Sequence, residues 1–207
     1  MKVLVACERS GRVRDAFIRH GHDAVSCDIF PSDAPGPHLE CDMWDSRVTR
    51  QHWDLAIIHP MCTYLCNSGV RWLYEHPWRW KLMVAGAQFF KACLDDFPAE
   101  RVAVENPIMH GHAVKIVGRE ADQTVQPHHF GDPFMKATCW WLKNLPKLKK
   151  TNPLEVPKDP VERRKWAEVH NASPGPERAK LRSTFYPGMS DACAAQWGTS
   201  AQTEHND

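Results

Sequence analysis

The sequence predicts an α/β fold in which mostly parallel strands form one doubly wound sheet with helices on both faces. Short apolar runs of strand length alternate with helical patterns along the first half of the chain, and several of these runs end in polar or acidic residues. A length of 207 residues is enough for one domain with a buried core. The net charge of +1 favours no class of partner.

The first strand–helix–strand unit lies at the amino terminus. Residues 2–7 read as a strand, and an apolar stripe at helical spacing (Val13, Ala16, Phe17) follows the turn at residues 8–11. Residues 23–27 give the second strand, which ends at Asp28. An acid at this place is typical of ribose recognition in nucleotide-binding folds, although a loop or capping acid is the structural alternative. The turn has one glycine, so the GxGxxG dinucleotide fingerprint is absent.

The next strand is predicted at residues 54–58, after a proline-rich loop at 29–41. It ends at His59-Pro60, and Cys62 stands two residues further on. The carboxyl edge of such a sheet is where ligands bind. From position alone Cys62 reads as a nucleophile, a metal ligand or a small packing residue.

A long helix is predicted across residues 71–97, with Val84, Ala87, Phe90 and Leu94 as its core-facing stripe. The strand after it, at 101–104, ends in Glu105-Asn106-Pro107. Asn-Pro is an ordinary turn dipeptide, but a glutamate directly after a buried strand is expected at the ligand edge.

The second half is expected to be rich in loops, because most of the prolines lie after residue 125. A loop is expected from residue 122, followed by a strand at 137–142. Lysines and arginines gather in 143–182, which suits either a phosphate backbone or a solvated surface loop. A short helix is expected at 190–197 and a disordered tail at 199–207.

The eight cysteines have irregular spacings, and we expect them to be reduced thiols. The sequence shows no signal peptide and no apolar run long enough to span a bilayer. A cytoplasmic protein without a membrane partner is the expectation.

Five segments taken together resemble the DNA (cytosine-5)-methyltransferases, and most closely the small phage- and prophage-type members. These segments are VLVAC with the following Ser-Gly, HPMCTYLCNSGVRWL, VAVENP, and RSTFYPGMSDACAAQWG near the end, with QPHHFGDPFMKATCWWLKNLP before the last of them. The resemblance runs in order along nearly the whole chain. It implies a Rossmann-like, S-adenosylmethionine-dependent methyltransferase fold and, for a phage-encoded member, the host cytoplasm.

The resemblance also implies a covalent mechanism on a cytosine that is flipped out of duplex DNA. Cys62 would be the nucleophile whose thiolate adds to C6. Glu105 would bind the N3 and amino edge of the base, and Asn106 would hold the loop that carries Cys62. Lys136, with Thr138, stands where the family has arginines.

The cofactor would be S-adenosylmethionine. Its methionine end would lie near Glu8, Ser10 and Gly11, its ribose near Asp28, and its adenine near Asp42. The complete set expected to bind the cofactor is Cys7, Glu8, Ser10, Gly11, Asp28, Ile29, Asp42, Met43 and Pro60. The set expected to bind the substrate is Thr63, Asn67, Arg71, Lys136, Thr138 and Arg182.

The resemblance implies a division of the chain without a large target-recognition domain. Residues 1–142 would form the methyltransferase core, 143–182 a basic insertion in place of that domain, 183–198 a closing segment and 199–207 the tail. We therefore expect relaxed or very short sequence specificity, and a monomer.

Other readings of the same residues remain open. Cys62 and Cys66 suggest a zinc deaminase, but the spacing is wrong and no His-x-Glu precedes them. A structural zinc site from His59, Cys62, Cys66 and His76 has no recognised spacing, and we expect no metal. A non-catalytic nucleic-acid-binding relic of the fold, or a cytosine methyltransferase acting on RNA or a free nucleotide, are the remaining alternatives.

Overall fold

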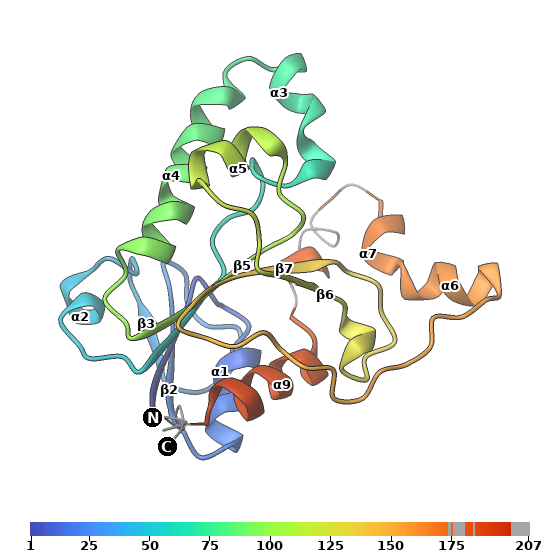
Figure 1. The fold of residues 1–207 in the computed structure, drawn as a ribbon. Helices are drawn as coiled ribbons and strands as arrows, with labels where there is room; N and C mark the ends of the chain where they lie inside the picture. Colours follow the sequence, from blue (N-terminus) through green and yellow to red (C-terminus); the bar gives the residue numbers. More distant parts are fainter. Residues whose placement is uncertain (174, 176–180, 184, 200–207) are drawn as a thin grey trace, which may run out of the picture.

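Seven strands form one sheet in the order β3-β2-β1-β4-β5-β7-β6 (Figure 1). The computed structural model describes residues 1–173, 175, 181–183 and 185–199. The strands are β1 (Lys2–Ala6), β2 (Asp23–Asp28), β3 (His38–Glu40), β4 (Leu55–Ile58), β5 (Arg101–Asn106), β6 (Gln123–Val125) and β7 (Thr138–Lys143).

The helices lie on both sides of this sheet (Figure 1). The α-helices are α1 (Arg12–Arg19), α2 (Ser46–Thr49), α3 (Arg71–Glu75), α4 (Arg79–Asp95), α5 (Gly111–Val117), α6 (Pro160–Trp166), α7 (Glu168–Asn171) and α9 (Pro187–Trp197). Two 3-10 turns are η1 (Asn67–Gly69) and η2 (Pro127–His129).

The parallel strands β1 to β5 create a switch point at the centre of the sheet. The chain moves from β1 outward to β2 and β3, and then returns to place β4 on the other side of β1. Loops leave the carboxyl ends of β1 and β4 in opposite directions there, which opens a crevice suited to a ligand. This is the Rossmann-like, doubly wound arrangement that the sequence predicts.

Strand β7 closes the sheet from the other direction. It runs antiparallel to both β5 and β6, and its register sets Glu105 opposite Trp140 and Asn106 opposite Cys139. Side chains alternate between the two faces along a strand. Glu105 and Asn106 therefore face opposite sides of the sheet.

Two hydrophobic clusters fill the two faces. One holds α4 and α5 against the sheet through residues such as Met83, Phe90 and Val117. The other holds α1 and α9 through Phe17 and Trp197. The first and last helices of the described chain thus pack together on one face, and an ion pair between Arg19 and Asp191 joins them at 2.7 Å.

Some strand predictions were wrong in detail. The first strand ends at Ala6 and not at residue 7, because Cys7 turns out of the strand with a left-handed φ of 56°. The loop predicted at 29–41 contains the edge strand β3, and the loop from residue 122 contains β6. Both strands are short and partly polar, so they lack the apolar run that marks a buried strand.

The long helix predicted at 71–97 is two helices. Proline at residue 77 cannot continue a helix, so α3 ends at Glu75 and α4 begins at Arg79. Val84 is 37% exposed and does not belong to the core stripe, while Ala87, Phe90 and Leu94 are buried as predicted. The helices α2 and α5 were not predicted.

The segment 143–182 is less irregular than predicted. Helix α6 begins at Pro160, where the Asp159 carboxylate caps the backbone N–H groups of Val161 and Glu162, and α7 follows it. The final helix starts at Pro187, three residues earlier than predicted. The basic residues Arg178 and Lys180 and nearly all of the predicted tail at 199–207 lie outside the described residues. The division of the chain at 142 and 182 stays a prediction.

All eight cysteines are free thiols, which confirms that prediction. The helices in the described ranges include none with the length and apolar character needed to cross a bilayer.

Candidate active site

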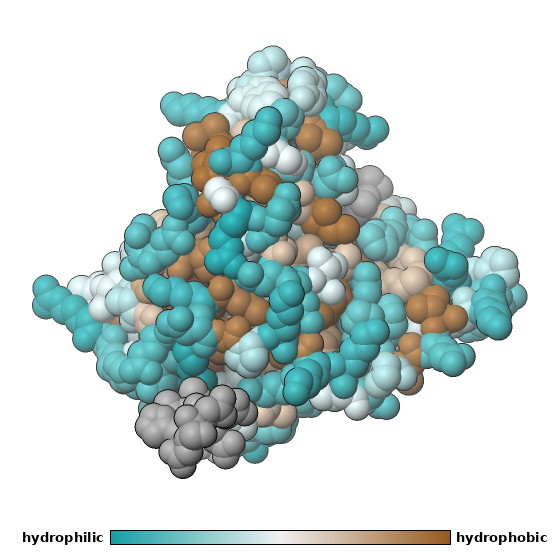
Figure 2. Space-filling view, in the orientation of Figure 1, coloured by the Kyte–Doolittle hydropathy of each residue, from teal (hydrophilic) through white to brown (hydrophobic). Residues whose placement is uncertain are grey.

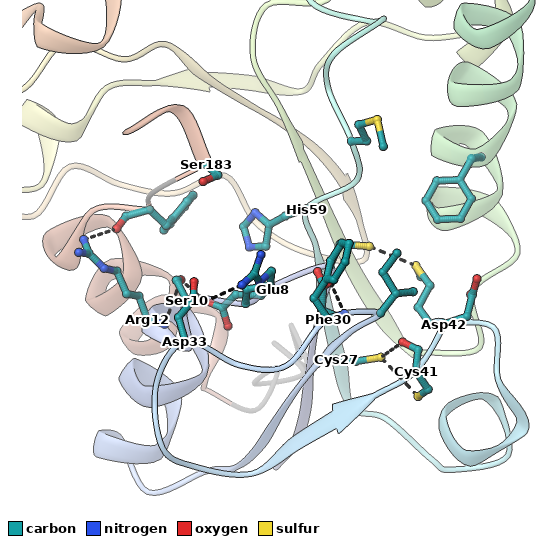
Figure 3. Close-up of a pocket in the computed structure, with 18 residues that line it drawn as sticks. Glu8, Ser10, Arg12, Cys27, Phe30, Asp33, Cys41, Asp42, His59 and Ser183 are labelled. Atoms are coloured by element: carbon teal, nitrogen blue, oxygen red, sulfur yellow. Dashed lines mark hydrogen bonds and ion pairs between the residues drawn. The ribbon is translucent and has the colours of Figure 1, made fainter. Parts of the chain in front are cut away.

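A cleft of about 1220 Å³ opens at the carboxyl edge of the sheet around β1, β2 and β3 (Figure 3). It is lined by residues from the ends of these three strands, from the first turn, and from the loops that carry His59 and Phe185. The lining residues are Cys7, Glu8, Arg9, Ser10, Arg12, Cys27, Asp28, Ile29, Phe30, Asp33, Cys41, Asp42, Met43, His59, Met61, Phe89, Ser183 and Phe185.

The carboxylate of Glu8 organises the turn after β1. Its Oε1 accepts hydrogen bonds from the backbone N–H of Val13 at 2.8 Å and from the Ser10 hydroxyl at 3.1 Å. Its Oε2 accepts one from the backbone N–H of Arg14 at 3.3 Å. Glu8 is buried, so these bonds satisfy donors at the start of α1 that no helix partner reaches. Glu8 acts first as the anchor of α1 and presents little free carboxylate to the cleft.

A buried arginine on α1 holds the outer wall of the cleft. Arg14 is fully buried, and its guanidinium donates to the carbonyl of Pro35 at 2.7 Å and to the hydroxyl of Ser26 at 3.1 Å. This guanidinium fixes the proline-rich loop against α1 and β2. Gly11 and Gly36 have positive φ angles of 69° and 136°, and a Cβ at either would lie within 2.7 Å of the guanidinium. Glycine is therefore needed at both positions for space as well as for backbone conformation.

Two acids stand at the ends of neighbouring strands. Asp28 ends β2, and its Oδ1 accepts from the backbone N–H of Phe30 at 3.0 Å. Asp42 follows β3, and its Oδ1 accepts from the backbone N–H of Trp44 at 2.8 Å. Each acid uses one oxygen to shape its own turn, which leaves the carboxylate held in a fixed position beside the cleft. The adjacent Ile29 and Phe30 are exposed and give the cleft an apolar wall.

His59 and Glu105 pair across the ends of β4 and β5. The His59 Nδ1 lies 3.5 Å from the Glu105 Oε2, and the two side chains are only 13% and 14% exposed. The His59 ring packs edge-on against Trp140 and Phe185, with ring centroids 6.1 Å and 5.2 Å apart. His59 also lines the cleft (Figure 3). It therefore joins the cleft to the carboxylate of Glu105.

The thiol of Cys62 is half-buried, and charges of both signs lie near it. Burial raises its pKa to about 11, with smaller contributions from the charges of Glu105 and Cys66. The charges of Arg182 and Lys136 act in the opposite direction. The free protein therefore keeps Cys62 as a thiol at neutral pH, although two cations near it favour the thiolate.

Lys136 and Arg182 form the cationic side of this site. Burial lowers the pKa of Lys136, while the charges of Glu105 and Cys62 raise it. The Lys136 Nζ donates to the backbone carbonyl of Arg182 at 2.5 Å. The Arg182 guanidinium in turn donates to the Cys66 sulfur at 3.4 Å. Segments far apart in the sequence are thus tied together around Cys62.

Asn106 does not hold the Cys62 loop through its side chain. The residue is fully buried, and neither its Oδ1 nor its Nδ2 forms a hydrogen bond with any described residue. The loop is held by backbone bonds instead. The Leu65 carbonyl accepts from His110 N–H at 3.0 Å, and the Ile108 carbonyl accepts from Asn67 N–H at 2.7 Å.

Most residues expected to bind a cofactor lie together around the cleft. Gly11 and Pro60 are the exceptions, because neither lines it. Gly11 instead begins α1 in the left-handed conformation. The residues expected there that do line the cleft are Cys7, Glu8, Ser10, Asp28, Ile29, Asp42 and Met43.

The residues expected to contact a substrate are more scattered. Thr63, Asn67 and Arg71 are exposed on the segment after Cys62. Thr138 is the clear exception, because it is buried and its hydroxyl donates to the backbone carbonyl of Lys136 at 3.2 Å. The position of Thr138 therefore suits a residue that supports Lys136, and not one that contacts a substrate.

Several residues of the site were not predicted as such from the sequence. Arg9 and Asp33 pair at 2.9 Å across the cleft mouth, and Phe185 comes from the far end of the chain. His59 was considered only as a zinc ligand. Its place at the end of a buried strand is the signal that marks it as a site residue.

The four residues considered for zinc do not converge into one group. Among the described residues, three potential metal ligands approach one another only at His52, Asp54 and Glu100. Asp54 precedes β4, so this group lies at the opposite end of the strand from Cys62.

No family model matches the sequence, and no curated protein matches it. Solved structures do. One is a candidate DNA modification methyltransferase encoded within an Escherichia coli prophage, 14% identical, with a TM-score of 0.43 over 69% of this chain and 46% of the other. Another is the methyltransferase EhMeth of Entamoeba histolytica, 13% identical, with a TM-score of 0.47 over 74% of this chain and 57% of the other. The chain thus spans about half the length of these two structures.

Proposed function

We propose that this protein is an S-adenosylmethionine-dependent methyltransferase that acts on C5 of cytosine in DNA through a covalent bond to Cys62. One observation carries the proposal. The thiol of Cys62 follows the end of β4, and the carboxylate of Glu105 lies near the end of the adjacent parallel strand β5. The charge of Glu105 contributes to the raised pKa of Cys62. They stand beside a cleft with an acid at the end of each of two further strands. The resemblance of the sequence motifs supports the same assignment.

The cleft suits S-adenosylmethionine in size and in chemistry. Asp28 at the end of β2 is placed to accept from ribose hydroxyls, and Asp42 after β3 to accept from an adenine amino group. Ile29, Phe30 and Met43 supply apolar walls for the purine. Bound there, S-adenosylmethionine would supply the methyl group as an electrophile.

Cytosine needs activation before its C5 can attack a methyl group. The proton of Cys62 passes to the carboxylate of Glu105, and the Cys62 Sγ bonds to C6 while Glu105 gives that proton to N3. This addition places electron density on C5, which takes the methyl group as the bond between the methyl carbon and the sulfonium sulfur breaks, so that the demethylated cofactor is the leaving group. Water then takes the C5 proton, the electron pair of that C–H bond expels Sγ from C6, and N3 returns its proton to Glu105, which restores the aromatic ring and the Cys62 thiolate. Lys136 and Arg182 favour the thiolate at the first and last steps.

His59 is the positioning residue for Glu105 in this scheme. Its Nδ1 faces one carboxylate oxygen, and Trp140 and Phe185 fix the plane of its ring. A fixed imidazole beside the carboxylate keeps Glu105 turned toward the base and can return a proton to it. The short cationic segment after β7 is consistent with little sequence selection by the enzyme.

The test is methyl transfer from labelled S-adenosylmethionine to duplex DNA, single-stranded DNA, RNA and dCMP. We expect transfer to DNA by the wild type, loss of at least about 1000-fold in Cys62→Ala, and a covalent adduct with DNA that contains 5-fluorocytosine. Cys193→Ala, which removes a buried thiol on α9, is the matched control and should keep activity. Transfer only to RNA or dCMP would change the substrate from DNA to RNA or to a free nucleotide. Inactivity on all four substrates, or full activity of Cys62→Ala, would overturn the proposal.

A further inference from the structure

Helix α3 and the turn that leads into α4 carry a surface of aromatic rings and cations. It consists of the exposed residues Arg71, Tyr74, His76 and Trp78 and the half-buried residues Trp72 and Arg79, and we name it the α3 surface. Tyr74 is 63% exposed and Trp78 is 59% exposed. These two aromatic residues therefore leave more than half of their surface open to a partner.

The α3 surface lies on the lobe formed by α3, α5 and the start of α4, which projects away from the sheet (Figure 1). Figure 2 shows pale side chains of intermediate hydropathy at the tip of this lobe, with hydrophilic side chains beside them. Arg71, Arg79 and Lys81 oppose one acid, Glu75, between residues 71 and 90. The lobe is thus both aromatic and positively charged.

Cations hold several of the rings in place. The Arg71 guanidinium lies 4.5 Å from the Trp72 ring centroid, and the Arg79 guanidinium lies 5.5 Å from that of Trp78. The Tyr74 hydroxyl pairs with the His112 Nε2 at 2.8 Å. Trp80 and His112 contact the Tyr74 ring at steep angles of 89° and 64°. These contacts fix the ring, while most of the residue stays exposed to solvent.

The α3 surface is fixed relative to both reactive side chains of the proposed active site. Arg71 begins α3 shortly after Cys62 in the chain. The loop between them is bonded to the segment after β5, where the His110 Nε2 and the carbonyl of Tyr64 are 2.9 Å apart. Glu105 is the next-to-last residue of β5. The α3 surface is therefore joined through hydrogen-bonded segments to the residues on either side of the proposed active site.

We propose that the α3 surface binds the unpaired bases that flank the target cytosine, as a stacking platform for single-stranded nucleic acid. An unpaired base offers a flat face to Tyr74 or Trp78, and the phosphates beside it suit Arg71 and Arg79. A duplex hides these faces within its stack. Tyrosine, tryptophan and arginine are also enriched at protein interfaces, so what favours nucleic acid here is the excess of positive charge on the lobe, with Arg71, Arg79 and Lys81 against Glu75. The location beside the site rests on the proposed function, but the binding itself does not.

The test measures affinity without catalysis. Cys62→Ala protein is titrated into fluorescein-labelled 12-nucleotide single strands and into the matching duplex, and anisotropy is read at two salt concentrations. We expect tighter binding of the single strand. Adding Trp78→Ala should weaken it roughly tenfold, since stacking on one ring is worth about 1–3 kcal/mol. Trp78→Phe, which keeps an aromatic face, should recover most of the affinity.

Arginine variants give a second and independent readout. Arg71→Ala should weaken single-strand binding and reduce the slope of log affinity against log salt by about 0.7. Arg47→Ala on α2 is the matched control, because Arg47 is an exposed arginine away from this lobe and should leave the slope unchanged. Circular dichroism spectra of all variants establish that they are folded.

Three outcomes would overturn the inference. They are an unchanged single-strand affinity in Trp78→Ala, equal losses for single strand and duplex, and a Trp78→Phe variant as weak as Trp78→Ala. Loss of self-association in Trp78→Ala with nucleic-acid binding intact would make the surface a protein interface instead. Failure of methyl transfer alone leaves these affinities interpretable, so the two proposals fail separately.

Discussion

The two halves of the site are built in opposite ways. On the β1–β2 side, buried polar groups are paired: Glu8 caps α1, and Arg14 bonds the loop that forms the cleft wall. On the β4–β5 side, polar atoms of His59 and Asn106 are buried without a hydrogen bond to any described residue. Met61, next to Cys62, is 68% exposed.

The contrast indicates which interactions hold the side chains of each half in place. The β1–β2 half is complete in the protein alone, because its buried polar groups have hydrogen-bond partners there. The β4–β5 half keeps donors and acceptors unpaired inside the protein, each at a cost in stability. Such groups are expected where a substrate completes the arrangement. Four experiments test this contrast.

The largest effect on stability is expected in the β1–β2 half of the site. Arg14→Met removes the buried guanidinium and leaves the carbonyl of Pro35 and the hydroxyl of Ser26 without their donor. We expect the free energy of unfolding to fall by about 3 kcal/mol, because buried unpaired acceptors cost about 1–3 kcal/mol each. Urea denaturation measures the loss. Arg47→Ala, which removes an exposed ion pair, should not measurably change stability, and an equal loss in both variants would contradict the structural role of Arg14.

The second effect concerns the reactivity of Cys62. Because its pKa is about 11 instead of the ordinary 9.0, the thiolate at pH 8 should be about 100-fold scarcer than for an ordinary thiol. Alkylation by iodoacetamide, followed at the Cys62 peptide by mass spectrometry, should speed up about tenfold per pH unit up to pH 11. Glu105→Gln removes a negative charge, lowers the pKa of Cys62 and should speed alkylation at pH 8. Lys136→Met should slow it. A midpoint below pH 9 would show that the thiol is already activated.

The third effect tests the turn at the start of α1. Gly11→Ala places a Cβ 2.3 Å from the Arg14 Nη2 in a residue with a φ of 69°. We expect a loss of about 2 kcal/mol or more in unfolding free energy, of which the left-handed backbone accounts for about 1–2 kcal/mol. Gly118→Ala isolates this backbone cost, because Gly118 has a φ of 87° with no atom within 4 Å of an added Cβ. Equal losses of stability for Gly11→Ala and Gly118→Ala in thermal denaturation would mean that the Arg14 side chain moves aside at no cost.

The smallest effect on stability is expected in the β4–β5 half of the site. Asn106→Leu replaces a buried, unpaired amide with an apolar side chain of similar size. We expect stability to stay the same or rise by about 1 kcal/mol, because no protein hydrogen bond is lost. Methyl transfer should fall in the same variant. A large loss of stability would show that the amide supports the fold.

The sequence predicted the parallel core of the sheet and the strand ends that carry Asp28, Cys62 and Glu105, because buried strands and the residues after them leave a strong local pattern. It could not predict that the Glu8 carboxylate is occupied by hydrogen bonds to the start of α1, or that Thr138 is buried with its hydroxyl bonded to the backbone of Lys136. Those outcomes depend on packing between segments far apart in the chain. The break at Pro77 was visible as a proline, but the helical period on both sides of it favoured one helix. The orientation of His59 toward Glu105 depends on Trp140 and Phe185, which local patterns do not connect to it.

The placement of β7 has a consequence for how the protein is synthesised. Strand β5 pairs with β4 early, since both precede β7 in the chain, and its other edge then stays open until residues 138–143 have left the ribosome. During that interval β5 is an unprotected sheet edge, the kind of surface on which nascent chains aggregate. Trp140, which faces the pocket of His59 and Glu105, arrives on the strand that seals this edge. The pairing of β7 with β5 therefore covers the open sheet edge and completes the packing around His59 and Glu105 in one folding event. A nascent chain stalled before that event would have an open edge and an incomplete site.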